Sequence, residues 1–374
     1  MLINNKIGHR PTWAQINLDN LEHNFLEVRK KVGRGTKILV TVKADAYGHG
    51  LIAVSKRLAE CKVDFLGVAS IDEGIKLREA GIGVPILVLG LMLKSDLPPL
   101  FEYDLATSIC DEKLGRALNN LARLKGRKLS VHIKVDTGMG RIGVSHYDAH
   151  KLVKSIYNLK HLKVEGIFTH FAFADMNRKF TFHQIDLFDK LVRALAGSNI
   201  NIPLVHAANS MGVLEYKQSH FNMVRPGLVI YGLHPKEKLV INLKPVLSLK
   251  TKVIFVKNVP AGSGISYGHE YITKRATQIV TLPIGYGDGY PRNLSNKAPV
   301  LIKGRRFKIC GRICMDQIMV DVGRTPVRIG DEVVLIGTQG KNKVTVEELA
   351  DLSDTIPYEI VCGLGSRIPR IHEP

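Results

Sequence analysis

The strongest constraint on the fold is a repeated alternation of strand-like and helix-like segments between residues 38 and 231. Short runs rich in Val, Ile and Leu are each followed by a longer amphipathic segment. This pattern predicts eight strands, at Ile38–Val42, Phe65–Ala69, Pro85–Leu89, Leu105–Ile109, Ser130–Val135, Val164–Thr169, Pro203–Ala207 and Met223–Tyr231. Eight β/α units in about 200 residues favour a closed (β/α)8 TIM barrel over an open doubly wound sheet, which usually has fewer strands.

The segments between these strands have the spacing of amphipathic helices. Asp19 is expected to cap the first helix, with Glu22 at the capping-box position. Helical spacing predicts five further helices, at Ser55–Cys61, Asp72–Ala80, Asp111–Leu124, Asp148–Tyr157 and Gln184–Leu195. No G-x-G-x-x-G turn follows the first strand, which argues against a dinucleotide-binding domain.

Helical periodicity almost disappears after Leu243. Alternating or apolar runs predict strands at Leu249–Val256, Gln278–Leu282, Val300–Ile302, Phe307–Ile309, Gln317–Val322 and Glu332–Ile336, with one helix at Val346–Leu352. We therefore expect a barrel domain over residues 1–243 and a mainly antiparallel β domain over residues 244–374. The first 17 or so residues include a strand-like run that could pair with the second domain.

Net charge and hydropathy limit the kinds of partner that we expect for this chain. The 53 Lys and Arg exceed the 34 Asp and Glu, which raises nucleic-acid binding as an alternative. The basic residues are scattered, however, and no DNA-binding or RNA-binding motif is present, so we expect no nucleic-acid partner. No apolar run approaches the roughly 20 residues of a bilayer span, and residues 1–10 lack the apolar segment of a secretion signal. We expect no membrane association and a cytoplasmic location.

The cysteines support a reducing compartment. There are five, an odd number, and they lie mostly in apolar segments, which suits reduced thiols. Cys310 and Cys314 lack a second Cys or His pair at ligand spacing, so we expect no metal site.

Polar side chains follow the predicted strands, where a barrel enzyme keeps its functional groups. Lys43 stands at the end of the first strand, and partial desolvation there would favour its neutral amine, which can form a Schiff base. The other groups are Lys134 and Arg141 around the fifth strand, His170 after the sixth, Asn209 and Ser210 after the seventh, and Arg225 in the eighth. Any one of them alone could be structural, but together they indicate an active site.

The stretch Val42–Gly50, VKADAYGHG, resembles the cofactor attachment site of alanine racemases, and the similarity extends from Arg10 to Arg370. The resemblance implies pyridoxal 5′-phosphate bound to Lys43, with His170 stacked against its ring. It also implies a phosphate site made by the side chains of Tyr47, Ser210 and Tyr358, with Asn209 adjacent, and by the backbone around Gly227 and Leu228. Hydroxyls and free amides are suitable donors to a phosphate dianion.

The resemblance places Arg225 against the ring nitrogen of the cofactor. A guanidinium can donate to this nitrogen but not accept from it, so the nitrogen is expected to stay unprotonated. A weaker electron sink favours prompt return of a proton over transamination or decarboxylation. Lys134 resembles a lysine that many members of the family carry as a carbamate, which would hold Arg141 by a charge-assisted hydrogen bond. Arg141 would then orient the cofactor or the substrate carboxylate.

Racemisation needs a second acid and base on the face opposite Lys43. The loop Gly264–Gly268 resembles the family's catalytic tyrosine loop, with Tyr267, and Cys314–Gln317 resembles its substrate-contacting loop, with Met315. In the family both loops come from the neighbouring subunit, which implies a homodimer with composite active sites. An unaided phenol is a poor base near neutral pH, so Tyr267 would need a neighbouring cation or hydrogen-bond partner.

The chain is thus expected to be an isomerase, a cytoplasmic alanine racemase that supplies D-alanine for peptidoglycan. The alternative on the same fold is a serine racemase or one of broader specificity. A related decarboxylase would need an acidic residue where Arg225 stands, and a non-catalytic cofactor carrier would not need Tyr267 and Met315. The chain departs from the family pattern at Gln15, Asn17, Phe173 and Gly287, of which Phe173 and Gly287 could alter access or substrate preference.

Overall fold

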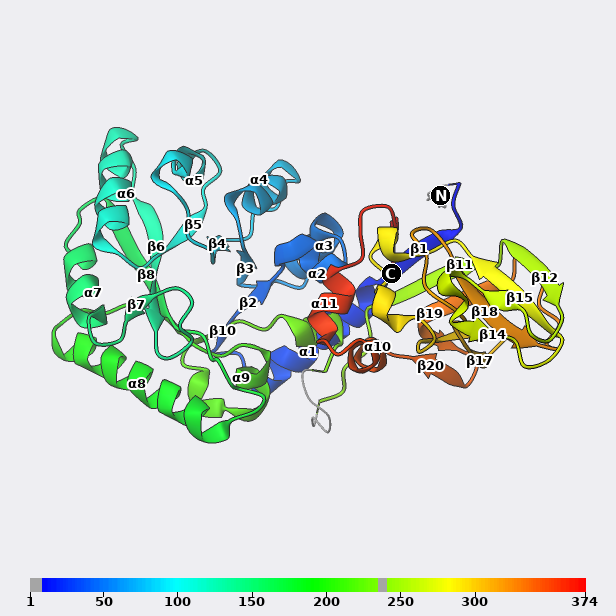
Figure 1. Ribbon diagram of the computed structural model, residues 1–374. Helices are drawn as coiled ribbons and strands as arrows, with labels where there is room; N and C mark the ends of the chain where they lie inside the picture. Colours follow the sequence, from blue (N-terminus) through cyan, green and yellow to red (C-terminus); the bar gives the residue numbers. More distant parts are fainter. Residues whose placement is uncertain (1–8, 235–240) are drawn as a thin grey trace.

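Eight parallel strands close into a barrel in the computed structural model, which describes residues 9–234 and 241–374 (Figure 1). Around the barrel the strands are β2 (Lys37–Thr41), β3 (Phe65–Val68), β4 (Ile86–Val88), β5 (Ala106–Ile109), β6 (Leu129–Asp136), β8 (Leu162–Phe168), β9 (Leu204–His206) and β10 (Met223–Val224). Pairing of β5 with β6 and of β10 with β2 completes the ring. The TIM barrel expected from the sequence is confirmed.

One helix precedes the first barrel strand and the others follow barrel strands, in the expected order. They are α1 (Leu18–Val32), α2 (Lys43–Gly48), α3 (Leu51–Glu60), α4 (Ile71–Glu79), α5 (Pro98–Glu102), α6 (Glu112–Leu124), α7 (Ala149–Tyr157), α8 (Arg178–Gly197) and α9 (Ser210–Glu215). A short strand, β7 (Val144–Ser145), extends β6 at the rim. Short 3-10 helices lie at Lys94–Asp96, Lys217–Ser219, Leu228–Tyr231, Tyr267–His269, Tyr286–Asp288 and Arg292–Leu294.

Two local predictions are wrong. The eighth strand was expected over Met223–Tyr231, but β10 ends at Val224 and Leu228–Tyr231 forms a 3-10 helix. Pro226 lacks a backbone donor, which ends the strand and frees the following residues to turn. The cap of α1 is Asn17 rather than Asp19, because the Asn17 side chain accepts a hydrogen bond from the Asn20 amide.

The second part of the chain is built from antiparallel strands, as expected. They are β11 (Leu247–Lys252), β12 (Phe255–Val259), β13 (Gly264–Ile265), β14 (Tyr271–Ile272), β15 (Thr277–Leu282), β16 (Pro299–Ile302), β17 (Arg305–Lys308), β18 (Ile318–Gly323), β19 (Glu332–Gln339) and β20 (Asn342–Val344). The predicted strand Leu249–Val256 is divided into β11 and β12. The chain ends with α10 (Val346–Leu352), as predicted, α11 (Pro357–Cys362), which was not, and β21 (Arg370–Glu373).

The first strand of the chain belongs to the second sheet. β1 (Thr12–Asn17) pairs antiparallel with β11 and parallel with β21, so the expected pairing of the N-terminal strand with the second domain is confirmed. The domain boundary after residue 243 stays a prediction, and residues 235–240 just before it lie outside the described part. So do residues 1–8, which belong to the segment expected to carry no secretion signal. In the described residues no helix is both long and apolar enough to span a membrane.

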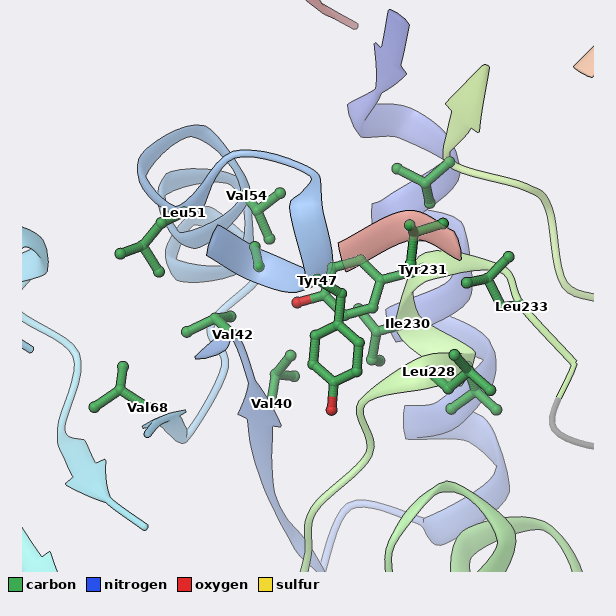
Figure 2. Packing of buried hydrophobic residues seen from close by; sticks show 14 of the residues in the cluster. Val40, Val42, Tyr47, Leu51, Val54, Val68, Leu228, Ile230, Tyr231 and Leu233 are labelled. Carbon is green, nitrogen blue, oxygen red and sulfur yellow. The ribbon is translucent and has the colours of Figure 1, made fainter. Parts of the chain in front are cut away.

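Apolar packing joins the barrel mouth to the turn after β2. Tyr47 and Tyr231 are buried with their ring centroids 4.8 Å apart, next to Val40, Leu228 and Ile230 (Figure 2). The Tyr231 hydroxyl donates to the Thr41 carbonyl at 2.9 Å. The 3-10 helix at Leu228–Tyr231 is therefore fixed against the strand that precedes Lys43.

Asn24 on α1 makes the main polar link between that helix and the segment after the barrel. Its amide donates to the carbonyls of Ile230 and Lys244, and its oxygen accepts from the Lys244 amide. Asn24→Ala should lower the free energy of unfolding by about 2–4 kcal/mol, because buried backbone groups lose their partners. Urea unfolding should give a lower midpoint at unchanged slope. Exposed Asn158, replaced by Ala, is the control; an equal loss there would contradict this account.

Candidate active site

The turn after β2 has an unusual backbone conformation. Ala44, Asp45, Ala46 and Tyr47 all have φ of 53–54°, so four consecutive residues other than glycine form a left-handed turn within α2. Each such residue costs roughly 1–2 kcal/mol relative to a right-handed conformation. Strain of this kind persists only where surrounding contacts impose it, and it concentrates at functional sites.

Three side chains from two other segments support this conformation. Glu73 on α4 accepts from the amides of Ala44 and Ala69, at 2.6 and 2.7 Å. The carbonyls that end the turn are held by the C-terminal strand, where Arg370 donates to Gly48 and His372 donates to His49. Glu73, Arg370 and His372 were not identified from the sequence, because their partners are backbone groups of a turn whose shape the sequence does not reveal.

Lys43 begins this turn at the C-terminal end of β2, as predicted, and its side chain is partly buried. Burial lowers the pKa of Lys43, and the nearby positive charge of Arg141 lowers it further, against a smaller opposing effect of Glu73. Partial desolvation thus makes the neutral, nucleophilic amine more accessible at neutral pH.

Four basic side chains surround His170. Burial lowers its pKa well below the ordinary value, and the charges of Arg225, Lys134, Arg141 and Lys43 add to the effect in that order. Barrel closure therefore brings these five predicted residues together, from β2, β6, β8 and β10. The imidazole is therefore neutral at pH 7. A site with this many basic groups, in which Arg225 keeps its charge, suits a ligand that carries negative charge.

Lys134 is buried on β6, with its amine 4.6 Å from the ring centre of Phe168. Burial lowers its pKa well below the usual range, and Arg225 and Arg141 contribute. The Arg141 side chain is exposed at the barrel mouth, on a loop fixed by Asp136, which accepts from the amides of Gly138, Met139 and Gly140. The Asp-x-Gly-x-Gly spacing is the signal in the sequence for this turn.

Arg225 is buried without a carboxylate in contact among the described residues. Its guanidinium donates to the carbonyls of Thr169 and Ala207, at 2.6 and 3.0 Å, and to Nδ1 of His206 at 3.0 Å. Burial lowers the pKa of Arg225 to about 9, still above neutrality, so the group keeps its charge. The role of His206 was missed, although a histidine at the end of an apolar strand was visible.

Ser210, Tyr47 and Gly227 form a small polar cradle. The Ser210 hydroxyl accepts from the amides of Gly227 and Val229, at 3.1 and 3.5 Å. A Cβ at Gly227 would lie 2.5 Å from the Tyr47 hydroxyl, so the glycine leaves room beside that group. Tyr358 on α11 lies near, with its ring centre 5.7 Å from that of Tyr47, and buried Leu228 follows the glycine. This arrangement suits a phosphate group.

Asn209 has a structural contact at the same strand end. Its side chain accepts from the Gly212 amide and caps α9, which begins at Ser210. The cap fixes the position of the serine next to it. Gln184 on α8, which the sequence analysis missed, similarly holds the segment after β8 by donating to the His170 carbonyl and accepting from the Ala172 amide.

Tyr267 and Met315 lie in the second part of the chain, on loops outside the barrel. Both are exposed, at 68% and 53%. Their loops are joined, because the Ser266 hydroxyl donates to the Arg312 carbonyl, and the Met315 carbonyl accepts from the Gly287 amide. Tyr267, Met315 and Tyr286 therefore form one exposed edge, which we call the tyrosine edge.

Two of the residues that depart from the family pattern, Gly287 and Phe173, contact defined neighbours in the structure. A Cβ at Gly287 would lie 2.6 Å from the Arg367 guanidinium and 3.0 Å from the Met315 carbonyl oxygen, so alanine would have to displace them. Phe173 is exposed beyond β8 and packs edge-on against Phe180. Among the described residues, no three His, Cys, Asp or Glu side chains are grouped as metal ligands.

Comparisons with known proteins cover nearly the whole chain. The family described as "Alanine racemase, N-terminal domain" matches residues 16–235, and "Alanine racemase, C-terminal domain" matches residues 246–372. An alanine racemase of Halothermothrix orenii is 50% identical over 98% of both chains. The structure of a Clostridium difficile alanine racemase is similar with a TM-score of 0.93 and 37% identity, covering 98% of this chain and 96% of that one. A cycloserine complex of the alanine racemase from that organism gives a TM-score of 0.90 and 36% identity, over 97% and 95%.

Proposed function

Because this chain belongs to the alanine racemase family and interconverts L-alanine and D-alanine, we propose that it does so with pyridoxal 5′-phosphate bound to Lys43. The observation that carries this proposal is the combination of a desolvated lysine, a polar cradle and a surrounding set of cations. When bound, the cofactor supplies an electron sink that stabilises negative charge at the substrate Cα.

Each end of the cofactor has matching residues. Tyr47, Ser210, Tyr358 and the backbone at Gly227 and Leu228 would bind its phosphate, and Asn209 supports them by capping α9. His170 would stack on its ring, and Arg225 would donate to its ring nitrogen. Arg225 cannot accept a proton there, so it keeps the ring a moderate electron sink and favours proton return over side reactions.

Lys134 is proposed to carry a carbamate that orients Arg141 toward the substrate carboxylate. Burial lowers the pKa of Lys134, which increases the fraction of neutral amine, the form that combines with carbon dioxide. The resulting anion would lie among the cations around His170 and offset part of their mutual repulsion.

We propose a homodimer in which the tyrosine edge of one subunit covers the barrel mouth of the other. A second acid and base is needed opposite Lys43, and Tyr267 and Met315 lie on exposed loops of the second part of the chain. Their exposure supports contribution to a partner's site. Lys43 would then hold or move the proton on one face of Cα, and Tyr267 of the partner subunit on the other.

We also propose a cellular location and a use for the product. Five free cysteines suit a cytoplasmic enzyme, and D-alanine is the building block we expect it to supply for peptidoglycan. The relatives reported above are named for alanine, which favours alanine over serine, the alternative substrate considered from the sequence.

Gly227→Ala tests the phosphate cradle. The added Cβ would press against the Tyr47 hydroxyl, so affinity for pyridoxal 5′-phosphate should fall by about 10-fold or more, since binding groups must be held within about half an ångström. Titration of the cofactor-free protein, followed by visible absorption, measures this affinity. Gly197→Ala is the matched control, because nothing lies within 4 Å of its added Cβ. Unchanged affinity in Gly227→Ala would contradict the proposed cradle.

A further inference from the structure

Arg225 is connected to a distant carboxylate through two buried histidines. Nδ1 of His206 lies 3.0 Å from Arg225, Nε2 of His206 lies 2.9 Å from Nδ1 of His132, and Nε2 of His132 lies 3.6 Å from Glu165. We propose that Glu165 is a positioning residue that fixes the hydrogen-bond direction along this chain and so holds Arg225 in place. The inference rests on the proposed function, in which Arg225 faces the ring nitrogen of the cofactor.

The direction of hydrogen-bond donation along this series of side chains follows from the chemistry of Arg225 and Glu165 at its two ends. Arginine has only donors, so Nδ1 of His206 must accept and, in a neutral ring, Nε2 carries the hydrogen. That hydrogen is donated to Nδ1 of His132, which leaves the hydrogen of His132 on Nε2, facing Glu165. Both histidines are fully buried, and burial lowers the pKa of each, so both rings are neutral.

In the described part of the chain Glu165 is the only group beside Nε2 of His132, and it reinforces from this end the state that Arg225 and His206 favour from the other. The contact with His132, followed by the hydrogen bond from Lys163, lowers the pKa of Glu165 to about 2, so it is an anion. A carboxylate favours the N–H form of the nitrogen that faces it. Without this carboxylate, His132 could carry its hydrogen on Nδ1, where it would face the N–H donor of His206.

An irregularity in the backbone of β8 places Glu165 beside His132. β8 has a register shift opposite β6, where Val131 pairs with Val164 but His132 pairs with Gly166, so Glu165 is the bulged residue. Bulges commonly redirect a side chain near a functional site. Gly166 leaves space for the histidine, because a Cβ there would lie 2.2 Å from Nδ1 of His132. Phe168 stacks on His206, with ring planes 6° apart, and fixes the second ring.

The two histidines also connect Arg225 to a counter-charge without a direct ion pair. Arg225 and His206 each donate in the direction of Glu165, and Nε2 of His132 faces the carboxylate at 3.6 Å, so the carboxylate is coupled to the guanidinium across two polarised rings. Reversal of the two tautomers would present an N–H of His206 to Arg225, and the guanidinium would have to move. A movement of this kind would misplace the donor at the ring nitrogen.

The test is the hydrogen position on each histidine, read from imidazole ¹⁵N chemical shifts of the cofactor-loaded protein. His132→Gln and His206→Gln assign the signals among the 14 histidines. Wild type should carry hydrogen on Nε2 of both rings. Glu165→Gln, which retains an oxygen acceptor, should keep that state, and Glu165→Leu should lose it at His132. Finding the hydrogen on Nδ1 in wild type, or no change in Glu165→Leu, would overturn the inference.

Kinetics separate positioning from a purely structural effect. Glu165→Leu should lower kcat for alanine by about 10–100-fold, the usual effect of removing an outer partner, with KM changed less than about threefold. Lys163→Met is the matched control, since it removes the exposed ion pair but leaves the carboxylate, and should change kcat less than about twofold. A tautomer change with unaltered kcat would refute the positioning role. The cofactor assignment is tested separately, by visible absorption.

Discussion

Lys43→Ala should reduce racemisation of L-alanine by about 10⁴-fold or more, because one side chain is proposed both to hold the cofactor and to serve as an acid and base. The visible absorption of bound cofactor should also be lost. A coupled assay for D-alanine measures the first effect, and a spectrum of the purified protein measures the second. The strained turn that follows the lysine is fixed by Glu73, Arg370 and His372, so the fold around the substitution should persist.

Lys37→Ala provides the matched control for Lys43→Ala. It removes a lysine from the opposite end of the same strand, where the side chain is 51% exposed and 3.9 Å from Asp64. Activity and cofactor content should remain near wild type, since exposed ion pairs contribute little. Racemisation by Lys43→Ala at the wild-type rate would disprove the assignment of the lysine.

Tyr267→Phe should lower racemisation by about 10²–10⁴-fold, the range for loss of a positioned acid or base. Cofactor absorption should be retained, because Tyr267 is proposed to touch the substrate and not the phosphate site. Exchange of the Cα hydrogen in deuterated water should persist for one enantiomer, through Lys43, and be lost for the other. Retained exchange for both enantiomers would contradict a two-base mechanism.

Mixing the two variants tests the origin of Tyr267. A dimer of one Lys43→Ala chain with one Tyr267→Phe chain has one site with both groups intact, if the tyrosine comes from the partner subunit. An equal mixture that exchanges subunits should therefore regain about one quarter of wild-type activity, since half of its dimers have one working site. If both groups came from the same chain, the mixture would stay inactive, and the composite site would be ruled out.

The sequence predicts the barrel because each strand and helix has a local pattern. It misplaces the end of the last strand, where Pro226 and Gly227 terminate β10 after two residues. It also identifies Lys43, His170, Lys134 and Arg225 as neighbours, because strand ends in a closed barrel converge on one mouth.

Contacts that cross the barrel could not be predicted in the same way. Glu165, His132 and His206 each look like an ordinary strand residue, and their line toward Arg225 depends on a bulge and on which rings face each other. The left-handed turn after Lys43 depends on Glu73 and on the last residues of the chain, and no local pattern indicates either.

The position of β21 has a consequence for synthesis on the ribosome. β1 is made long before its parallel neighbour β21, and β21 also supplies Arg370 and His372 to the turn after Lys43. Pairing over such a long separation is slow and must wait until β21 has left the ribosome. The barrel strands can assemble earlier, but the lysine turn receives its full support only after β21 has been made. A nascent chain that has not yet reached β21 therefore lacks the contacts that hold the turn after Lys43, which makes maturation of the proposed cofactor site a late event of synthesis.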